Sequence, residues 1–288
     1  MHWLFIGAGN MASSLVGGLL GAHERPQHIA VVDPDQAVCQ RAESAFGIHS
    51  ATTVDAAISM LFSKNDPNRQ LGVVIAVKPH IVQTVCKSLS EYMQNTAAEG
   101  DRGVKPVFIS VAAGVRESSM KAWLPAGSAL VRCMPNTPAL LGLGVTALYA
   151  NAQCSVEDKS LAETLLDSAG LTLWVEHESA LDAVTAVSGS GPAYFFYLIE
   201  HMIDAGVSLG LTRDSAQTLA IETAFGAASM ARHRQHTPAE LRENVTSRGG
   251  TTAAALQTFD DHETAKIIHR ALMAAHDRAI ELGDELSN

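Results

Sequence analysis

The chain has 288 residues, of which 47% are hydrophobic and 17% are charged, and its formal net charge is −10. This composition excludes wholesale disorder, and the length is sufficient for one large domain or two ordinary ones. The acidic balance argues against nucleic acid or an anionic membrane surface as the main partner.

The cysteines and the hydropathy pattern predict a cytoplasmic protein. None of the four cysteines belongs to a C-x-x-C pair, so we expect small core residues in a reducing compartment and no metal site. The first residues lack the basic start of a signal peptide, and no run of 18 apolar residues could span a membrane.

His262, His269 and His276 recur every seven residues, which places them on one helix face. We favour a solvated face there, with a metal or pH role as the alternative.

Short apolar runs alternate with helical stretches over the first half of the chain. Polar alternation is missing from these runs, which is typical of strands buried on both faces of a parallel sheet. Alternation with helices predicts βαβ units with right-handed crossovers. The polar stretches 63–70 and 94–105 predict surface loops. The predicted strands are 2–6, 29–32, 71–77, 107–111 and 129–133, and the predicted helices are 11–20, 36–46 and 81–93.

After a strand at 171–175, the second half predicts helices only. Long helices are expected at 193–209, 213–233 and 262–282, the second with Thr212 as its N-cap. The sequence Thr237-Pro238-Ala239-Glu240 predicts a capping box at the start of a short helix. We therefore predict an α/β fold with a Rossmann-type domain at 1–174 and an all-α domain at 175–288.

A glycine motif lies directly between the first predicted strand and the first predicted helix. The residues Gly7-Ala8-Gly9-Asn10-Met11-Ala12 fit the pattern G-x-G-x-x-A. In a dinucleotide-binding fold, Gly7 permits the tight turn, Gly9 lets the backbone approach a pyrophosphate, and Ala12 allows close helix packing. The alternative is an ordinary strand–turn–helix joint.

Asp33 ends the second predicted strand, 21 residues after Ala12. A carboxylate at this place accepts hydrogen bonds from the adenosine ribose hydroxyls and repels a 2′-phosphate, which favours NADH over NADPH. The alternative is a turn-forming aspartate before Pro34.

Three further strand ends carry unusual residues. They are 76–79 (AVKP), 112–114 (AAG) and 134–138 (MPNTP), and ligands of open α/β sheets bind outside such carboxyl ends. Small residues at 112–114 would let a flat ring lie against the backbone. Prolines would stiffen the loop around Asn136, whose amide offers a donor and an acceptor. A plain turn is the alternative for each.

A second loop of this kind precedes a helix in the C-terminal half. The run from Asn244 to Thr252 reads NVTSRGGTT, and its glycines and hydroxyls suit a carboxylate or a phosphate. A threonine N-cap is the alternative interpretation.

These motifs together resemble one enzyme family. GAGNMA, AVKP, SVAAGV, RCMPNTPA, DAVTAVSGSGPAYFF and NVTSRGGTT occur in this order, and the chain is similar to pyrroline-5-carboxylate reductases from about residue 3 to residue 282. The resemblance implies hydride transfer from NADPH or NADH to the C=N bond of 1-pyrroline-5-carboxylate, which gives L-proline. It also implies a helical domain that forms a homodimer by interleaving, with dimers that often assemble into a decamer.

The resemblance implies roles for individual residues. Thr252 is the expected catalytic residue, because its hydroxyl would bond the ring nitrogen or relay a proton through water. Substrate contacts are implied for Glu178, Asn136, Thr251 and Thr252. Cofactor contacts are implied for Gly7, Ala8, Gly9, Asn10, Met11, Ala12, Asp33, Pro34, Ala76, Val77, Lys78, Pro79, Val111, Ala112, Ala113 and Asn244.

Two departures from the family pattern affect these expectations. Arg248 replaces a usual proline, which would loosen the loop and add a cation near an anionic substrate. Asp33 replaces a small hydroxyl residue that many NADPH-preferring members carry.

Two other functions fit parts of the sequence. A two-domain reductase for a 3-hydroxy acid or another imine would usually carry a catalytic lysine on its second domain. Here only Lys159 and Lys266 follow residue 150, and both are remote in sequence from the glycine motifs. A non-catalytic dinucleotide sensor is the other alternative, and the intact Thr251-Thr252 pair argues against it. The predicted helix 193–209 is apolar on more than one face, which predicts an obligate homodimer.

Overall fold

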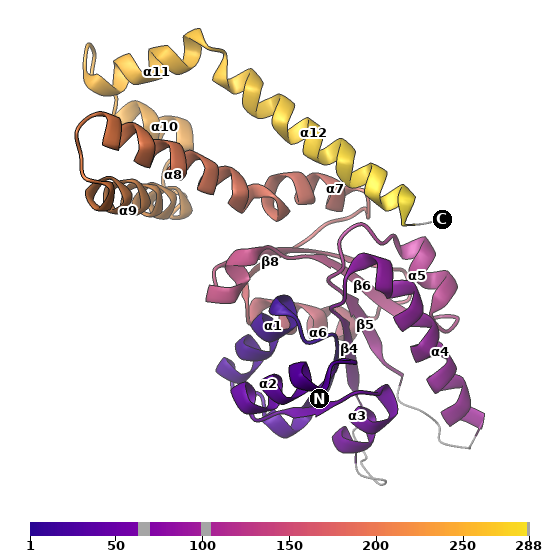
Figure 1. The fold of residues 1–288 in the computed structure, drawn as a ribbon. Helices are drawn as coiled ribbons and strands as arrows, with labels where there is room; N and C mark the ends of the chain where they lie inside the picture. Colours follow the sequence, from indigo (N-terminus) through magenta and orange to yellow (C-terminus); the bar gives the residue numbers. More distant parts are fainter. Residues whose placement is uncertain (63–69, 99–104, 287–288) are drawn as a thin grey trace. The chain divides into compact units, whose positions relative to one another are not determined.

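The computed structural model describes residues 1–62, 70–98 and 105–286 (Figure 1). The chain forms two compact units, Met1–Gly189 together with Ala275–Asn288, and Ser190–Ala274. These boundaries differ from the predicted division after residue 174. Residues 175–189 belong to the first unit because ion pairs and hydrogen bonds tie them to the end of its sheet.

A single eight-stranded sheet forms the centre of the first unit (Figure 1). Its order is β3-β2-β1-β4-β5-β6-β7-β8, and β1 to β6 are parallel. This is the strand order of a Rossmann fold, which confirms the predicted fold class. β7 pairs antiparallel with β6, and β8 pairs parallel with β7. The strands are β1 (His2–Ile6), β2 (Ile29–Val32), β3 (His49–Ala51), β4 (Leu71–Ile75), β5 (Val107–Ser110), β6 (Ala129–Met134), β7 (Gly144–Ala150) and β8 (Gly170–Trp174).

Helices cover both faces of this sheet, which is why its strands lack polar alternation. In β1, Trp3 and Phe5 face one core cluster, whereas Leu4 and Ile6 face the other. One face carries α1 (Asn10–Gly21), α2 (Gln36–Phe46) and α6 (Val156–Asp167). The other face carries α3 (Val54–Leu61), α4 (Val82–Ala98) and α5 (Glu117–Trp123) (Figure 1).

The predicted strands of the first half are all present, with small differences at their ends. β4 ends at Ile75 and not at residue 77. The loop predicted from residue 94 was wrong over 94–98, because α4 continues through Ala98 in residues with adequate helix propensity. Residues 63–69 and 99–104 of the predicted loops lie outside the described residues. Six strands and α-helices described in the first unit were not predicted, namely β3, α3, α5, β7, α6 and α7 (Ala180–Val184).

The second unit is entirely helical, as predicted. It contains α8 (Gly191–Ser208), α9 (Arg213–Arg232), α10 (Pro238–Asn244), α11 (Thr251–Asp261) and the beginning of α12 (Thr264–Glu285). Thr212 caps α9 by accepting from Ser215 N at 3.2 Å, and the predicted capping box at Thr237 and Glu240 is formed. His262 follows the end of α11, so it does not share a helix face with the two histidines of α12. No helix in the described residues is long and apolar enough to cross a membrane.

The second unit has almost no interior of its own. Among residues 190–274, burial is complete only for Gly191, Ala216 and Ala220. Large apolar side chains are exposed instead, and Phe195 and Phe196 of α8 are each 65% accessible. A helical segment of this length needs a buried apolar core to be stable. These helices therefore present apolar surface that a further protein surface must cover.

Candidate functional site

A cavity of about 640 Å³ lies at the carboxyl ends of β1, β2 and β4. The chain order reverses between β1 and β4, and ligands of open α/β sheets bind at such a switch point. We call it the switch-point cavity. It is lined by Ile6, Gly7, Gly9, Val32, Asp33, Pro34, Thr52, Thr53, Val54, Ala76, Val77, Lys78, His80, Ile81, Thr84, Val85 and Ser88.

The two glycines of the N-terminal motif differ in the space around their Cα atoms. Gly7 has φ +94°, and a Cβ there would lie 2.7 Å from the carbonyl oxygen of Ala76. Only glycine fits this position. An added Cβ at Gly9 meets nothing within 4 Å, so the backbone there borders open space. The loop therefore leaves room at Gly9 for a group such as a pyrophosphate to approach the start of α1.

Asp33 is held by backbone donors on both sides. Its Oδ2 accepts from Ala8 N of the glycine loop at 3.2 Å, and its Oδ1 accepts from Asp35 N at 3.0 Å. The second bond is the turn geometry expected as the alternative, and Asp33 also borders the switch-point cavity. Asp35 in turn caps α2 by accepting from Ala37 N at 2.8 Å.

The other residues of the glycine motif support the loop. Asn10 and Met11 begin α1, and Ala12 is buried in the core cluster between α1 and the sheet. Val111 packs against that cluster, and its N–H donates to Ile75 O at 3.1 Å. None of these four is among the residues lining the switch-point cavity.

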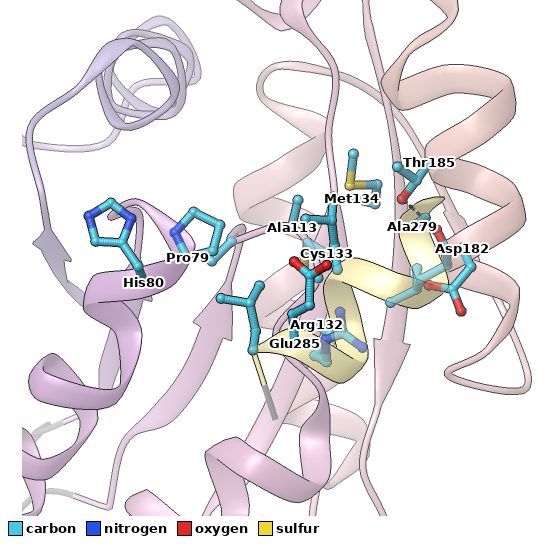
Figure 2. A pocket seen from close by; sticks show the side chains of 15 residues that line it. Pro79, His80, Ala113, Arg132, Cys133, Met134, Asp182, Thr185, Ala279 and Glu285 are labelled. Atoms are coloured by element: carbon cyan, nitrogen blue, oxygen red, sulfur yellow. Dashed lines mark hydrogen bonds between the residues drawn. The ribbon is translucent and has the colours of Figure 1, made fainter. Parts of the chain in front are cut away.

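A second cavity, of about 250 Å³, lies beyond the carboxyl ends of β5 and β6 (Figure 2). We call it the strand-end cavity. His80 lines both cavities, which makes them neighbours. In Figure 2, Pro79 and His80 lie on one side of this cavity and Asp182 and Thr185 on the other. Its lining consists of Pro79, His80, Ala112, Ala113, Gly114, Arg132, Cys133, Met134, Leu181, Asp182, Thr185, Ala279, Leu282, Glu285 and Leu286.

Sequence reasoning found only part of this lining. Pro79, Ala112 and Ala113 were predicted, and they follow β4 and β5 directly. Arg132 and His80 were not predicted as lining residues, although Arg132 begins the motif RCMPNTPA and His80 directly follows the motif AVKP. The contributions of α7 (Ala180–Val184) and of the end of α12 come from distant sequence, so no local signal could reveal them.

Two ion pairs hold the segment around α7 against the rest of the first unit. Nη1 of Arg116 contacts both carboxylate oxygens of Asp182, at 3.0 Å from Oδ1 and 2.9 Å from Oδ2. Arg132, which is 5% exposed, pairs with Glu178. Glu178 also accepts from Glu117 N at 2.5 Å. The carboxylate of Glu178, predicted as a substrate contact, is thus engaged within the protein and does not line either cavity.

The side chain of Asn136, like that of Glu178, is hydrogen-bonded within the protein. Its Oδ1 accepts from Val145 N at 3.0 Å, and its Nδ2 donates to Ser188 O at 3.1 Å. Ser188 belongs to a π-helical turn, Thr185–Gly189, which ends the first unit. The donor and the acceptor of the Asn136 amide together join this turn to β7. Asn136, also predicted as a substrate contact, is 9% exposed.

Cys133 lines the strand-end cavity as a neutral thiol. Its burial raises the pKa of the thiol far above the ordinary value, because a thiolate would lose its hydration there. A neutral thiol is a poor nucleophile. Covalent chemistry at this cysteine is therefore disfavoured.

In the second unit, a tight turn precedes the threonine pair. Gly250 N donates to Ser247 O at 3.0 Å, and Gly249 has φ +73°. This is the pattern of a type II turn, in which position i+1 is Arg248. Gly250 is the N-cap of α11, so Thr251 and Thr252 are its first two helical residues. Neither threonine is the N-cap, which removes the alternative interpretation of this pair. Asn244, the predicted cofactor contact, is exposed at the end of α10.

Comparisons with known proteins relate almost the whole chain to one family. Residues 178–282 match the family model described as pyrroline-5-carboxylate reductase dimerisation, and residues 4–98 match the model described as NADP oxidoreductase coenzyme F420-dependent. A pyrroline-5-carboxylate reductase of Pseudomonas aeruginosa is 42% identical over 98% of this chain and 97% of its own length.

Solved structures give the same relationship. A pyrroline-5-carboxylate reductase from Coxiella burnetii superposes with a TM-score of 0.86 at 34% identity, covering 98% of both chains. The Plasmodium falciparum pyrroline carboxylate reductase, solved with NADP bound, superposes with a TM-score of 0.81 at 25% identity, again over 98% of both chains.

Proposed function

Because this chain belongs to the pyrroline-5-carboxylate reductase family, we propose that it reduces 1-pyrroline-5-carboxylate to L-proline with NADPH or NADH. This reaction is the final step of proline biosynthesis. The observation that carries the proposal is the adjacency of two cavities at His80, one at the switch point and one at the ends of β5 and β6. A dinucleotide needs an extended site, and its reactive ring needs a separate pocket at the strand ends.

The switch-point cavity fits the adenosine and pyrophosphate portions of the cofactor. Gly9 leaves open space above the backbone at the start of α1, where N–H groups and the helix dipole favour an anion. Asp33 and Pro34 border the same cavity, and Lys78 adds a cation. When bound, the nicotinamide supplies a hydride. Pro79, Ala112 and Ala113 would provide a small, flat wall for its ring.

The protein's own groups would chiefly orient the substrate. A cyclic imine can bind already protonated, and reduction of the protonated imine requires neither a strong general acid nor a histidine or cysteine in that role. Orientation of a small ring in a confined pocket is then the larger contribution to the rate. Thr252 offers a hydroxyl and a backbone N–H at the start of α11, and Thr251 precedes it. We assign the substrate carboxylate and ring nitrogen to this pair.

We propose that the enzyme works as a homodimer and that Thr251 and Thr252 complete the site of the partner. The support is the exposed apolar surface of residues 190–274 and the dimerisation family model that covers them. Light scattering at working concentrations should give at least twice the chain mass. We also propose that the dimers assemble into a decamer. We further propose that the protein is located in the cytoplasm, where its four unpaired cysteines would stay reduced.

The direct test is an assay of the purified protein with 1-pyrroline-5-carboxylate and each reduced cofactor, followed at 340 nm. Proline must form in a one-to-one ratio with the cofactor that is oxidised. A 3-hydroxy acid assayed with the oxidised cofactor tests the competing dehydrogenase function. Turnover of that acid without any reduction of the imine would overturn the proposal.

A further inference from the structure

The family description that matches the first unit names NADP, yet the residues around the switch-point cavity suit a different dinucleotide. We infer that this chain selects NADH over NADPH and that Asp33 is the residue that decides. This inference rests on the proposed use of a nicotinamide cofactor. It concerns which of the two cofactors binds and leaves the substrate open.

The first observation is that the Asp33 carboxylate is fixed in the cavity and cannot easily turn away. It borders the cavity at the end of β2, and each oxygen accepts a backbone hydrogen bond, one from Ala8 and one from Asp35. An unrestrained surface aspartate could rotate to avoid an anion. Asp33 would have to give up both bonds to do so, including the one to the glycine loop itself.

The second observation concerns charge. A 2′-phosphate at the adenosine ribose carries about two negative charges and needs cationic partners to offset them. Thr52 and Thr53 line the cavity and carry hydroxyls, but these groups have no charge. Lys78 is the only lysine or arginine among the described residues that line this cavity. It follows β4, whereas Asp33 follows β2, on the other side of β1.

The third observation is that the same carboxylate suits a ribose with free hydroxyls. A carboxylate accepts hydrogen bonds and donates none, so it complements the 2′- and 3′-hydroxyls of NADH. A carboxylate oxygen can accept two hydrogen bonds, and the structure shows one backbone donor to each oxygen of Asp33. The fixed position means that little ordering is required when the ribose binds.

The test is a comparison of dissociation constants for NAD+ and NADP+, measured by calorimetry on the full-length protein without substrate. NAD+ should bind the wild type about tenfold more tightly or better, because one like-charge contact at the protein surface is worth about one factor of ten. In Asp33→Asn, which keeps an acceptor but loses the charge, this ratio should fall to within about threefold of unity. Asp35→Asn is the matched control, since asparagine still caps α2 and position 35 does not line the cavity. Its ratio should remain that of the wild type.

The outcomes separate the inference from the proposed function. Equal or tighter binding of NADP+ by the wild type overturns the inference, and so does a ratio that Asp33→Asn leaves unchanged in a folded protein. The wild-type comparison needs no variant, so a poorly folded Asp33→Asn protein does not remove the test. Selective NAD+ binding without reduction of 1-pyrroline-5-carboxylate would leave the inference standing and remove the proposed function. Reduction with a preference for NADPH would do the reverse.

Discussion

The side-chain amide of Asn136 donates a hydrogen bond to the carbonyl of Ser188 across 3.1 Å, joining the loop after β6 to the π-helical turn that ends the first unit. The same amide accepts from Val145 N. Gly189 lies against the end of β6, since a Cβ there would be 2.4 Å from Cε of Met134. The turn is thus fixed at two successive residues.

Asn136→Ala should therefore act on stability. It leaves one partly buried N–H and one partly buried carbonyl without a partner, which should lower the free energy of unfolding by about 2–4 kcal/mol. Urea denaturation measures this change. The predicted substrate contact makes the opposite forecast, namely a raised KM with an unchanged unfolding midpoint.

Gly9→Val should abolish dinucleotide binding and leave the fold intact. The added side chain enters the open space at the start of α1 without striking any protein atom within 4 Å of its Cβ. Gly7→Val is the matched contrast, because it combines φ +94° with a Cβ only 2.7 Å from Ala76 O. We expect the second variant to lose its cooperative melt. Cofactor titration and circular dichroism distinguish them, and normal affinity in folded Gly9→Val would remove the pyrophosphate assignment.

Thr252→Ala should lower kcat/KM about 10- to 150-fold while cofactor affinity stays near normal. The basis is the loss of one hydrogen bond to a charged group, worth roughly 1.5–3 kcal/mol. Thr252→Ser should recover much of the activity. Because Gly250 is the N-cap of α11, the alanine variant should melt near the wild-type temperature. A lowered melting temperature with wild-type kinetics would retire the catalytic role.

Mixing two impaired variants tests whether the site is shared between subunits. Gly9→Val damages the cofactor loop, and Thr252→Ala damages the threonine pair. If each site combines the loop of one chain with the threonines of the other, a mixed dimer contains one intact site. Co-refolding the two variants should then restore activity to about a quarter of the wild-type level, as random pairing gives half mixed dimers with one site each. If all site residues came from one chain, activity would not recover.

Arg248→Pro should raise stability by about 0.4–1 kcal/mol, because proline is favoured at position i+1 of a type II turn and restricts the unfolded chain. The turn closes with arginine, as the bond between Gly250 N and Ser247 O shows, so the expected loosening is not seen in its backbone. Gly249→Ala serves as the contrast. Its φ of +73° should make alanine destabilising by about 1 kcal/mol in the same thermal melts.

The sequence was most informative where burial and local chemistry coincide. Strands such as β1 and β4 were predictable because both faces are covered and their residues form unbroken apolar runs. Gly7, Gly9 and Asp33 were predictable because they directly follow such strands. β3 was missed because it has three residues, one of which is His49, and β7 because it pairs antiparallel and is buried only in part.

The parts that could not be predicted depend on contacts between distant residues. Arg132 and Glu178 are 46 residues apart, and Arg116 and Asp182 are 66 apart. A single sequence does not show which cation meets which carboxylate. The roles given to Glu178 and Asn136 came from motif position, whereas their observed bonds depend on how α7 and the π-helical turn fold back onto the sheet.

The scarcity of buried residues between Ser190 and Ala274 has a consequence for the life of the protein in a cell. A region that buries only a glycine and two alanines gains little by folding alone. In the proposed homodimer its final ordering is a second-order reaction that requires an encounter between two chains. The melting temperature should therefore rise with protein concentration. A newly made chain at low abundance would spend longer with its helices uncovered, exposed to proteases and chaperones, than one made in quantity. Abundance and stability are thus coupled in this enzyme.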